Sequence, residues 1–134
     1  MPRQTHRYIP RRQDVLIGGN GADLLYGGSD TVKDIFKFNA ASDSTTLARD
    51  KIYNFLSGTD KFDFSGIDAN SKVAGDQAFA NTSIGTKAAN YSIWANASGS
   101  DLIISADTDG IASTIEFQLQ LMGVTKLAYA DVVL

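Results

Sequence analysis

A glycine-rich run that leads into one aspartate offers the clearest chemistry in this sequence. Residues 18–28 read Gly-Gly-Asn-Gly-Ala-Asp-Leu-Leu-Tyr-Gly-Gly. They fit the repeat Gly-Gly-x-Gly-x-Asp-x-U-x, in which U is a large apolar residue, and this repeat is typical of a parallel β-roll with calcium in its turns. Carbonyl and carboxylate oxygens without sulfur or imidazole favour calcium over zinc or copper. The run therefore predicts a calcium site with the ligand residues Gly18, Asn20, Gly21 and Asp23.

Incomplete copies of the repeat flank the intact one. Residues 14–17 match its second half but lack the preceding glycines, and residues 27–34 begin a copy whose turn is stretched. Two repeats make one coil of such a roll, so successive turns alternate between its two sides. We therefore expect Asp14 to lie on one side with the turn at residues 27–34, and Asp23 to lie on the other. These flanking copies add further candidate ligands, namely Asp14, Gly27, Ser29, Asp30 and Asp34.

Short β-strands are the elements predicted to hold these turns. Residues 35–38 read Ile-Phe-Lys-Phe, and Phe62 and Phe64 are spaced to share one face of a strand. Antiparallel strands are predicted at residues 91–95, 102–106 and 114–122, with hairpin turns at residues 98–99 and 109–110. In the last strand, alternate residues are expected to face a core: Ile115, Phe117, Leu119 and Leu121. Residues 125–131 are expected to form a short helical turn.

These patterns predict an all-β fold in which a short parallel β-roll is followed by antiparallel strands. We expect a basic leader at residues 1–13, the truncated roll at residues 14–38 and the antiparallel part at residues 39–134. Residues 107–110 read Asp-Thr-Asp-Gly and resemble the start of a calcium loop. Ile111 and Ala112 follow where further oxygen ligands would be needed, so this segment is interpreted as a turn.

Composition and charge narrow the class of protein. A chain of 134 residues can bury a core, and zero cysteines exclude a disulfide scaffold and a thiolate metal site. No apolar run approaches the length of a membrane span, so membrane insertion is not expected. All fifteen acidic residues lie after the first thirteen residues, which makes a nucleic-acid partner unexpected. The leader contains only basic charges, and it is either a foreign or drifted segment or an arm for a polyanion.

The order of these motifs resembles the C-terminal domain of serralysin-type secreted proteins, which belong to the repeats-in-toxin group. The resemblance rests on the intact repeat, on the strand at residues 35–38 and on residues 50–65, which read Asp-Lys-Ile-Tyr-Asn-Phe-Leu-Ser-Gly-Thr-Asp-Lys-Phe-Asp-Phe-Ser. It covers the chain from Asp14 to the end, although Asn54 stands where the family commonly has aspartate. It implies a short parallel β-roll that leads into an antiparallel β-sandwich, in a domain that binds calcium and folds outside the cell after bacterial type I export. The chain is expected to be a monomer.

The resemblance also implies residue roles and a partner. Asp50 and Asp60 match positions that lie near the last calcium in the family, and the alternative is that they cap a strand and a turn. The C-terminus resembles an uncleaved secretion signal, and its alternative role is a last edge strand. The signal residues would be Asp131, Val132, Val133 and Leu134. The implied partner is the type I secretion machinery, bound transiently, and the implied location is extracellular.

Two other classes of function compete with this interpretation. Catalysis is disfavoured because the only histidine, His6, lies in the leader and no zinc-protease helix or nucleophile elbow is present. If the parent protein is an enzyme, its active site lies in residues outside this sequence. The alternative is a polysaccharide-binding module, as in alginate-modifying enzymes. Its contacts would be a stripe of Lys33, Lys37, Lys51 and Lys61 and the rings of Tyr26, Tyr53, Tyr91 and Trp94.

Overall fold

The computed structural model describes residues 13–28 and 31–134 of the chain. The predicted leader, apart from Gln13, and the predicted ligands Ser29 and Asp30 lie outside the described residues. Within the described part, the secondary structure consists of short β-strands and two single-turn helices, η1 (Ala41–Asp43) and η2 (Tyr129–Asp131). No helix among these residues is long and apolar enough to cross a membrane. The all-β expectation is therefore confirmed.

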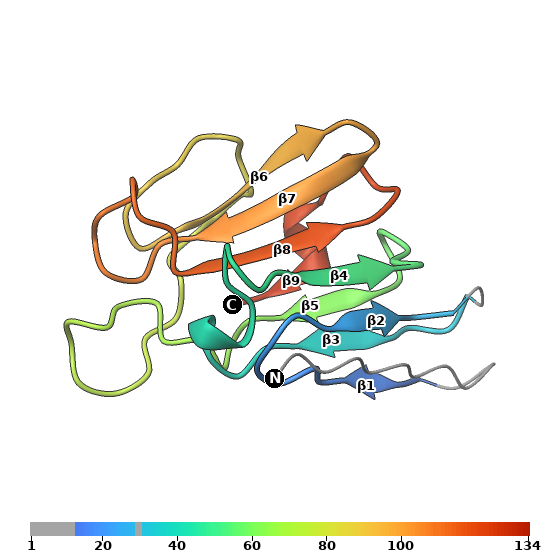
Figure 1. Cartoon of the computed structure of the whole chain (residues 1–134), viewed down its shortest axis with the longest axis horizontal. Coiled ribbons are helices and arrows are strands. Elements are labelled where there is room, and N and C mark those ends of the chain that lie inside the picture. The colour runs from blue at the N-terminus through green and yellow to red at the C-terminus, as the bar shows by residue number, and fades with distance from the viewer. Residues whose placement is uncertain (1–12, 29–30) are drawn as a thin grey trace.

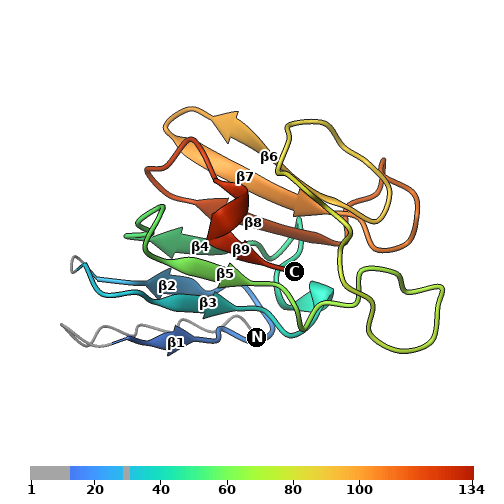
Figure 2. The same ribbon diagram turned by 180° about the vertical axis from the view of Figure 1, so that it is seen from behind.

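Two β-sheets lie face to face (Figures 1 and 2). The first sheet is entirely parallel in its described strands and has the order β1-β3-β5-β9. The second sheet has the order β2-β4-β8-β7-β6. Its strands β2, β4 and β8 are parallel to one another, whereas β7 pairs antiparallel with both β8 and β6. The strand bounds are β1 Val15–Leu16, β2 Leu24–Tyr26, β3 Ile35–Lys37, β4 Asp50–Tyr53, β5 Lys61–Asp63, β6 Ile93–Ser98, β7 Asp101–Ala106, β8 Phe117–Leu121 and β9 Val132–Val133.

The chain winds as a coil and adds strands to the two sheets alternately, from β1 through β5 and then through β8 and β9. The hairpin β6–β7 interrupts this coil and extends the second sheet beyond β8 (Figure 1). The roll was predicted to end at residue 38, whereas parallel pairing continues through β4, β5 and β9. The difference arises because these pairs, such as Phe62 with Val132, join segments that lie far apart in the sequence.

One apolar core fills the space between the sheets. Apolar residues of the short parallel strands point inward and are fully buried, and examples are Leu16, Leu25, Phe36, Ile52 and Phe62. Burial of each such side chain stabilises the fold by about 1.5–3 kcal/mol. The coils are therefore held together by side-chain packing in addition to any ion in the turns.

The predicted core positions agree with this packing. The rings of Phe62 and Phe64 stack with their centroids 5.5 Å apart, as expected for residues on one strand face. Phe117 and Leu119 in β8 are fully buried, whereas Ile115 precedes the strand and is only half-buried. The predicted helical turn is η2, and Gly99 occupies the β6–β7 turn with a φ of 62°.

Candidate metal site

Each strand of the first sheet is preceded directly by an aspartate, and we call these four residues the first aspartate column: Asp14, Asp34, Asp60 and Asp131. All four are buried, with at most 7% of the residue exposed. Asp34 Oδ1 accepts a hydrogen bond from the backbone N–H of Asp14 at 3.0 Å. Asp60 Oδ1 accepts one from the N–H of Asp34 at 2.9 Å. The structure thus brings Asp14 and Asp34 together on one side of the roll, where we expected them.

The last two members of the first aspartate column have both carboxylate oxygens engaged. Asp60 Oδ2 accepts the N–H of Leu56 at 2.8 Å, in addition to its bond from Asp34. Asp131 Oδ1 accepts the N–H of Gly58 at 2.9 Å, and its Oδ2 accepts the hydroxyl of Ser57 at 2.6 Å. Both residues therefore hold the turn that precedes β5. For Asp60 this is the turn-capping role that was given above as the alternative to metal ligation. Metal ligation by Asp60 stays a prediction.

The predicted secretion signal coincides with the last strand of the first sheet. Asp131 is fully buried, and Val132 pairs with Phe62 of β5. Val132 and Leu134 pack against the core, whereas Val133 is exposed. The segment is therefore an edge strand in the folded chain.

Asp23 and Asp50 form a second aspartate column at the starts of β2 and β4, on the strands of the second sheet. Both residues are fully buried. Asp50 Oδ1 accepts the backbone N–H of Asp23 at 2.8 Å. Asp50 Oδ2 has no hydrogen-bond partner among the described residues. Of Asp50 and Asp60, which the family resemblance gave as candidate ligands, Asp50 lies next to Asp23, whereas Asp60 accepts the N–H of Asp34.

The electrostatics of the second aspartate column differ from those of a solvated carboxylate. Burial is the largest cause and raises the pKa of Asp50 to about 8. The N–H of Asp23 opposes this effect, whereas the negative charges of Asp23 and Asp43 raise the pKa further. Two neighbouring buried carboxylates of this kind require a proton or a cation to compensate their charge.

The glycine turn before Asp23 is shaped around the carboxylate. A Cβ atom on Gly18 would lie 2.5 Å from Asp23 Oδ2, so only glycine leaves room for this side chain. Gly19 and Gly21 have φ angles of 75° and 90°, in the left-handed region that favours glycine. The ligand atoms that the structure places here are carboxylate oxygens, which suit Ca²⁺ and do not suit a metal that prefers thiolate or imidazole. The second aspartate column and its turn therefore fit calcium.

The stretched turn repeats part of this arrangement. A Cβ atom on Gly27 would lie 3.3 Å from Asp34 Oδ2 and 3.3 Å from the carbonyl oxygen of Asn54. Asn54 itself has a φ of 64°, a conformation that asparagine tolerates better than most residues. The departure from the family's aspartate at this position is therefore compatible with the local backbone.

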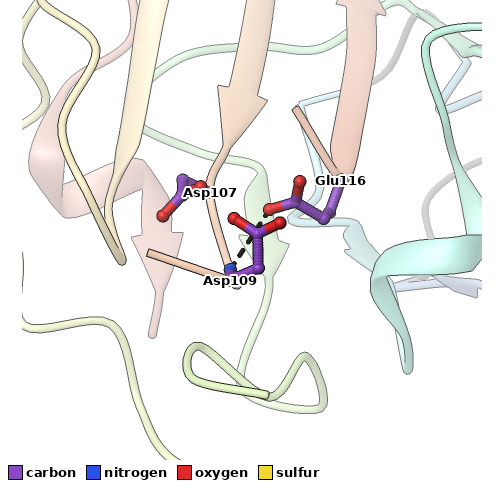
Figure 3. Close-up of side chains that lie close together, drawn as sticks. All are labelled: Asp107, Asp109 and Glu116. Carbon is purple, nitrogen blue, oxygen red and sulfur yellow. Dashed lines mark hydrogen bonds between the residues drawn. The ribbon is translucent and has the colours of Figure 1, made fainter. Parts of the chain in front are cut away.

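A third group of carboxylates lies outside the roll. Asp107, Asp109 and Glu116 have oxygens within 4.8 Å of one another (Figure 3). Residues 107–110, which were interpreted from the sequence as a turn, form a bend within the longer connection between β7 and β8. Glu116 was not among the residues that the sequence singled out. The predicted β-hairpin was the signal that could have identified Glu116. Ala106 pairs with Phe117, so Asp107, which follows Ala106, and Glu116, which precedes Phe117, lie close together.

The lysines expected to form one stripe are divided between the sheets. Lys37 and Lys61 lie on the first sheet, whereas Lys51 lies on the second. Trp94 is only 4% exposed, so its ring is not available for stacking on a ligand. Tyr26 and Tyr53 stack on each other with ring centroids 4.6 Å apart. The strands therefore place Lys51 on a different sheet from Lys37 and Lys61, and polysaccharide binding stays a prediction.

The fold and the aspartate columns define a repeats-in-toxin β-roll whose last coils merge with an antiparallel hairpin. Residues 13–134 match the family described as peptidase M10 serralysin C terminal, and the chain belongs to this family. The resemblance inferred from the motifs is thereby confirmed.

A solved structure shares this fold. It is the solution structure of the AlgE6R3 subunit from the Azotobacter vinelandii mannuronan C5-epimerase, with a TM-score of 0.60 and 22% sequence identity. The alignment covers 96% of this chain and 66% of that one, so this chain spans slightly less than two thirds of its length. A search of curated protein sequences found no significant match.

Proposed function

We propose that the chain is the calcium-binding C-terminal module of a larger secreted bacterial protein, which leaves the cell by type I export and folds outside it. The module itself is not an enzyme. The observation that carries the proposal is the pair of buried carboxylates of Asp23 and Asp50 beside the glycine turn at residues 18–23. Membership of the serralysin C-terminal family supports it.

Calcium compensates the charge of the second aspartate column under extracellular conditions. An ion held between the turn and Asp50 links β2 to β4, which are adjacent coils of the roll. An ion that is tenfold above its Kd stabilises the folded state by about 1.4 kcal/mol. The buried apolar residues contribute more than this in sum. One such site therefore biases folding toward the calcium-loaded state and does not by itself switch folding on.

The docking of the C-terminus ties export to folding in this proposal. The segment from Asp131 to Leu134 is engaged with β5 and with the turn at Ser57 and Gly58. A signal read by the secretion machinery must be undocked, which is the condition of a chain that has not yet folded. Low cytosolic calcium favours that condition, and docking of β9 then completes the roll after export.

The calcium part of the proposal is tested by thermal unfolding followed by circular dichroism, in calcium and in chelator. We expect calcium to raise the Tm of the wild-type chain by about 4 °C, the shift that about 1 kcal/mol produces in a domain of this size. Asp23→Asn should remove the shift. The exposed Asp76, changed to Asn, is the matched control and should keep it. Equal Tm values for the wild type with and without calcium would contradict the proposal.

The export part is tested with a carrier protein fused ahead of the chain in a type I secretion strain. Deletion of residues 131–134 should abolish export, whereas Phe62→Ala damages the core and leaves the terminal segment intact, so export should persist. Undiminished export of the deleted form would remove the signal role and leave the edge-strand role.

The polysaccharide-binding alternative has weaker support. Its lysines lie on different sheets and Trp94 is buried. The similar structure belongs to a mannuronan C5-epimerase, which is the reason to test the alternative. We expect short oligomannuronate, added at fixed free calcium, to leave the amide NMR spectrum unchanged. Saturable shifts that Tyr53→Ala abolishes would favour the alternative.

A further inference from the structure

The connection between β7 and β8 brings three carboxylates to one place (Figure 3). Asp107 follows β7 directly, Glu116 precedes β8 directly, and Asp109 lies in the turn between them. One oxygen from each residue lies within 4.8 Å of an oxygen from each of the others. Like charges at this spacing repel one another, so the arrangement is stable when a cation or a proton lies among them.

Asp107 is the buried member of this group, with 0% of the residue exposed. Its Oδ2 accepts the N–H of Tyr91 at 2.7 Å and the N–H of Gly110 at 3.0 Å. Its Oδ1 has no hydrogen-bond partner in the part of the chain that the structure describes. Figure 3 shows the side chain of Asp107 beside those of Asp109 and Glu116. A buried carboxylate oxygen without a donor is costly, and a bound cation removes that cost.

The other two carboxylates are held in place by backbone donors. Glu116 Oε1 accepts the N–H of Thr108 at 2.7 Å and the N–H of Asp109 at 3.3 Å. Asp109 Oδ1 accepts the N–H of Ile111 at 2.9 Å. Because these bonds fix the direction of both side chains, the group is organised before any ion arrives, which lowers the entropy cost of binding.

The positive side chain of Lys72 acts on Asp109. The N–H of Ile111 is the largest cause that lowers the pKa of Asp109, and the charge of Lys72 is the smallest. Lys72 is exposed, so water screens its charge. It therefore does not compensate the buried carboxylate of Asp107.

We propose that Asp107, Asp109 and Glu116 form a second divalent-cation site, with calcium as the preferred ion. Two oxygens that each lie about 2.4 Å from one calcium ion are at most about 4.8 Å apart. The observed spacing meets that limit. Calcium also tolerates the irregular geometry of a hairpin connection better than magnesium does. The ion fastens the β7–β8 connection to the start of β6, because Tyr91 donates its N–H to Asp107.

This site is independent of the roll. It shares no ligand with the second aspartate column and lies on the antiparallel extension of the second sheet. A result that contradicts calcium binding at the glycine turn therefore does not contradict this site, and the converse also holds. Tyr91 also provides a probe, because a Cβ atom on Gly110 would collide with its hydroxyl group and its ring therefore lies over the connection.

The test is a terbium titration of the full chain carrying Asp23→Asn, with emission excited through tyrosine. We expect emission that excess calcium displaces, that Tyr91→Phe reduces and that Glu116→Gln abolishes. Asp76→Asn, which removes the same charge from an exposed loop residue, should leave the emission unchanged. Emission that is equal with and without Glu116→Gln would overturn the proposal, as would the absence of calcium-displaceable emission.

Calorimetry with calcium on the wild-type background gives the second measure. We expect Glu116→Gln to lose one binding equivalent and Asp23→Asn to lose a different one. If only Asp23→Asn loses a binding equivalent, calcium binds in the roll and the site at Glu116 is overturned. If only Glu116→Gln loses one, calcium binds at Glu116 and the proposed roll site is contradicted. Glu116 is half-buried at the edge of the connection, so its replacement keeps the test valid if the buried Asp107→Asn fails to fold.

Discussion

The two aspartate columns occupy equivalent places at the starts of parallel strands, yet they carry their charges differently. In the first aspartate column, Asp60 and Asp131 receive hydrogen bonds on both carboxylate oxygens. In the second, Asp50 Oδ2 receives none from the described residues, and burial raises its pKa to about 8. The number of donors around a carboxylate, and not its place in the repeat, therefore decides whether it serves the fold or remains available for a cation.

Local chain geometry explains this difference. The turn that precedes β5 folds back so that Leu56 points its N–H at Asp60, and Gly58 points its N–H at Asp131. The segment that precedes β4 instead uses the hydroxyl of Ser44, which accepts the N–H of Asp50 at 2.9 Å and contributes no donor to its carboxylate. A turn that caps its own aspartate thus takes the place of an ion.

The largest effect on the free energy of unfolding is expected when an aspartate side chain of the first aspartate column is truncated to alanine. Asp60→Ala leaves the buried N–H of Asp34 and the partly buried N–H of Leu56 without their acceptor, and the loss of an acceptor costs a buried donor about 1–3 kcal/mol. We expect the free energy of unfolding to fall by about 3 kcal/mol, as measured by urea denaturation. The loss should be the same in calcium and in chelator. A loss confined to calcium-containing buffer would show that Asp60 is a ligand after all.

A pH titration separates the columns next. In the folded chain Asp50 holds its proton up to about pH 8, whereas its unfolded value is 3.8. The folded state therefore binds more protons between these values, and the free energy of unfolding falls as pH rises from about 4 to 8 in chelator. One proton gives a slope of at most about 1.4 kcal/mol per pH unit.

The matched variant for this titration is Asp50→Asn, which should flatten the slope between pH 5 and pH 8. It should also remove the stabilisation by calcium at pH 7.5. If the wild type and Asp50→Asn have parallel pH profiles in chelator, the carboxyl group of Asp50 is not the group that titrates and the contrast between the columns fails.

The smallest effect is expected in the glycine turn. Gly18→Ala places a methyl group against the carboxylate of Asp23, so we expect the calcium-induced rise in Tm to fall from about 4 °C to about 1 °C. Gly85→Ala is the control, because a Cβ atom there meets nothing within 4 Å and Gly85 does not have a positive φ. Differential scanning calorimetry in calcium and in chelator measures both. An undiminished calcium response in Gly18→Ala would exclude this turn from the site.

The glycine turn of the second aspartate column could largely be predicted from the sequence. The position of Asp50 beside Asp23 could not be predicted from the local sequence in the same way. The spacing of Gly18, Gly21 and Asp23 specifies the turn because it depends on local features. These are the positive φ of Gly21 and the space that Gly18 leaves for the side chain of Asp23. The pairing of Asp14 with Asp34 followed from the alternation of turns in a coil. The place of Asp50 came only from the family resemblance, because the segment before it lacks the glycine repeat.

Features that depend on distant pairing were not predicted. The parallel partnership of β9 with β5 joins the end of the chain to residues near its middle, and nothing in either strand alone specifies the other. Glu116 was overlooked for a related reason, since its neighbour Asp107 lies across a hairpin. Sequence patterns report local backbone preferences, whereas both features arise from tertiary packing.

The most direct measurement for the central claim is a crystal structure of the full chain grown in millimolar calcium, with an anomalous difference map at a wavelength sensitive to calcium. We predict a peak beside the turn at residues 18–23, with carboxylate oxygens of Asp23 and Asp50 about 2.3–2.6 Å from the ion. A map without a peak there, with both carboxylates neutralised by protons alone, would contradict the account.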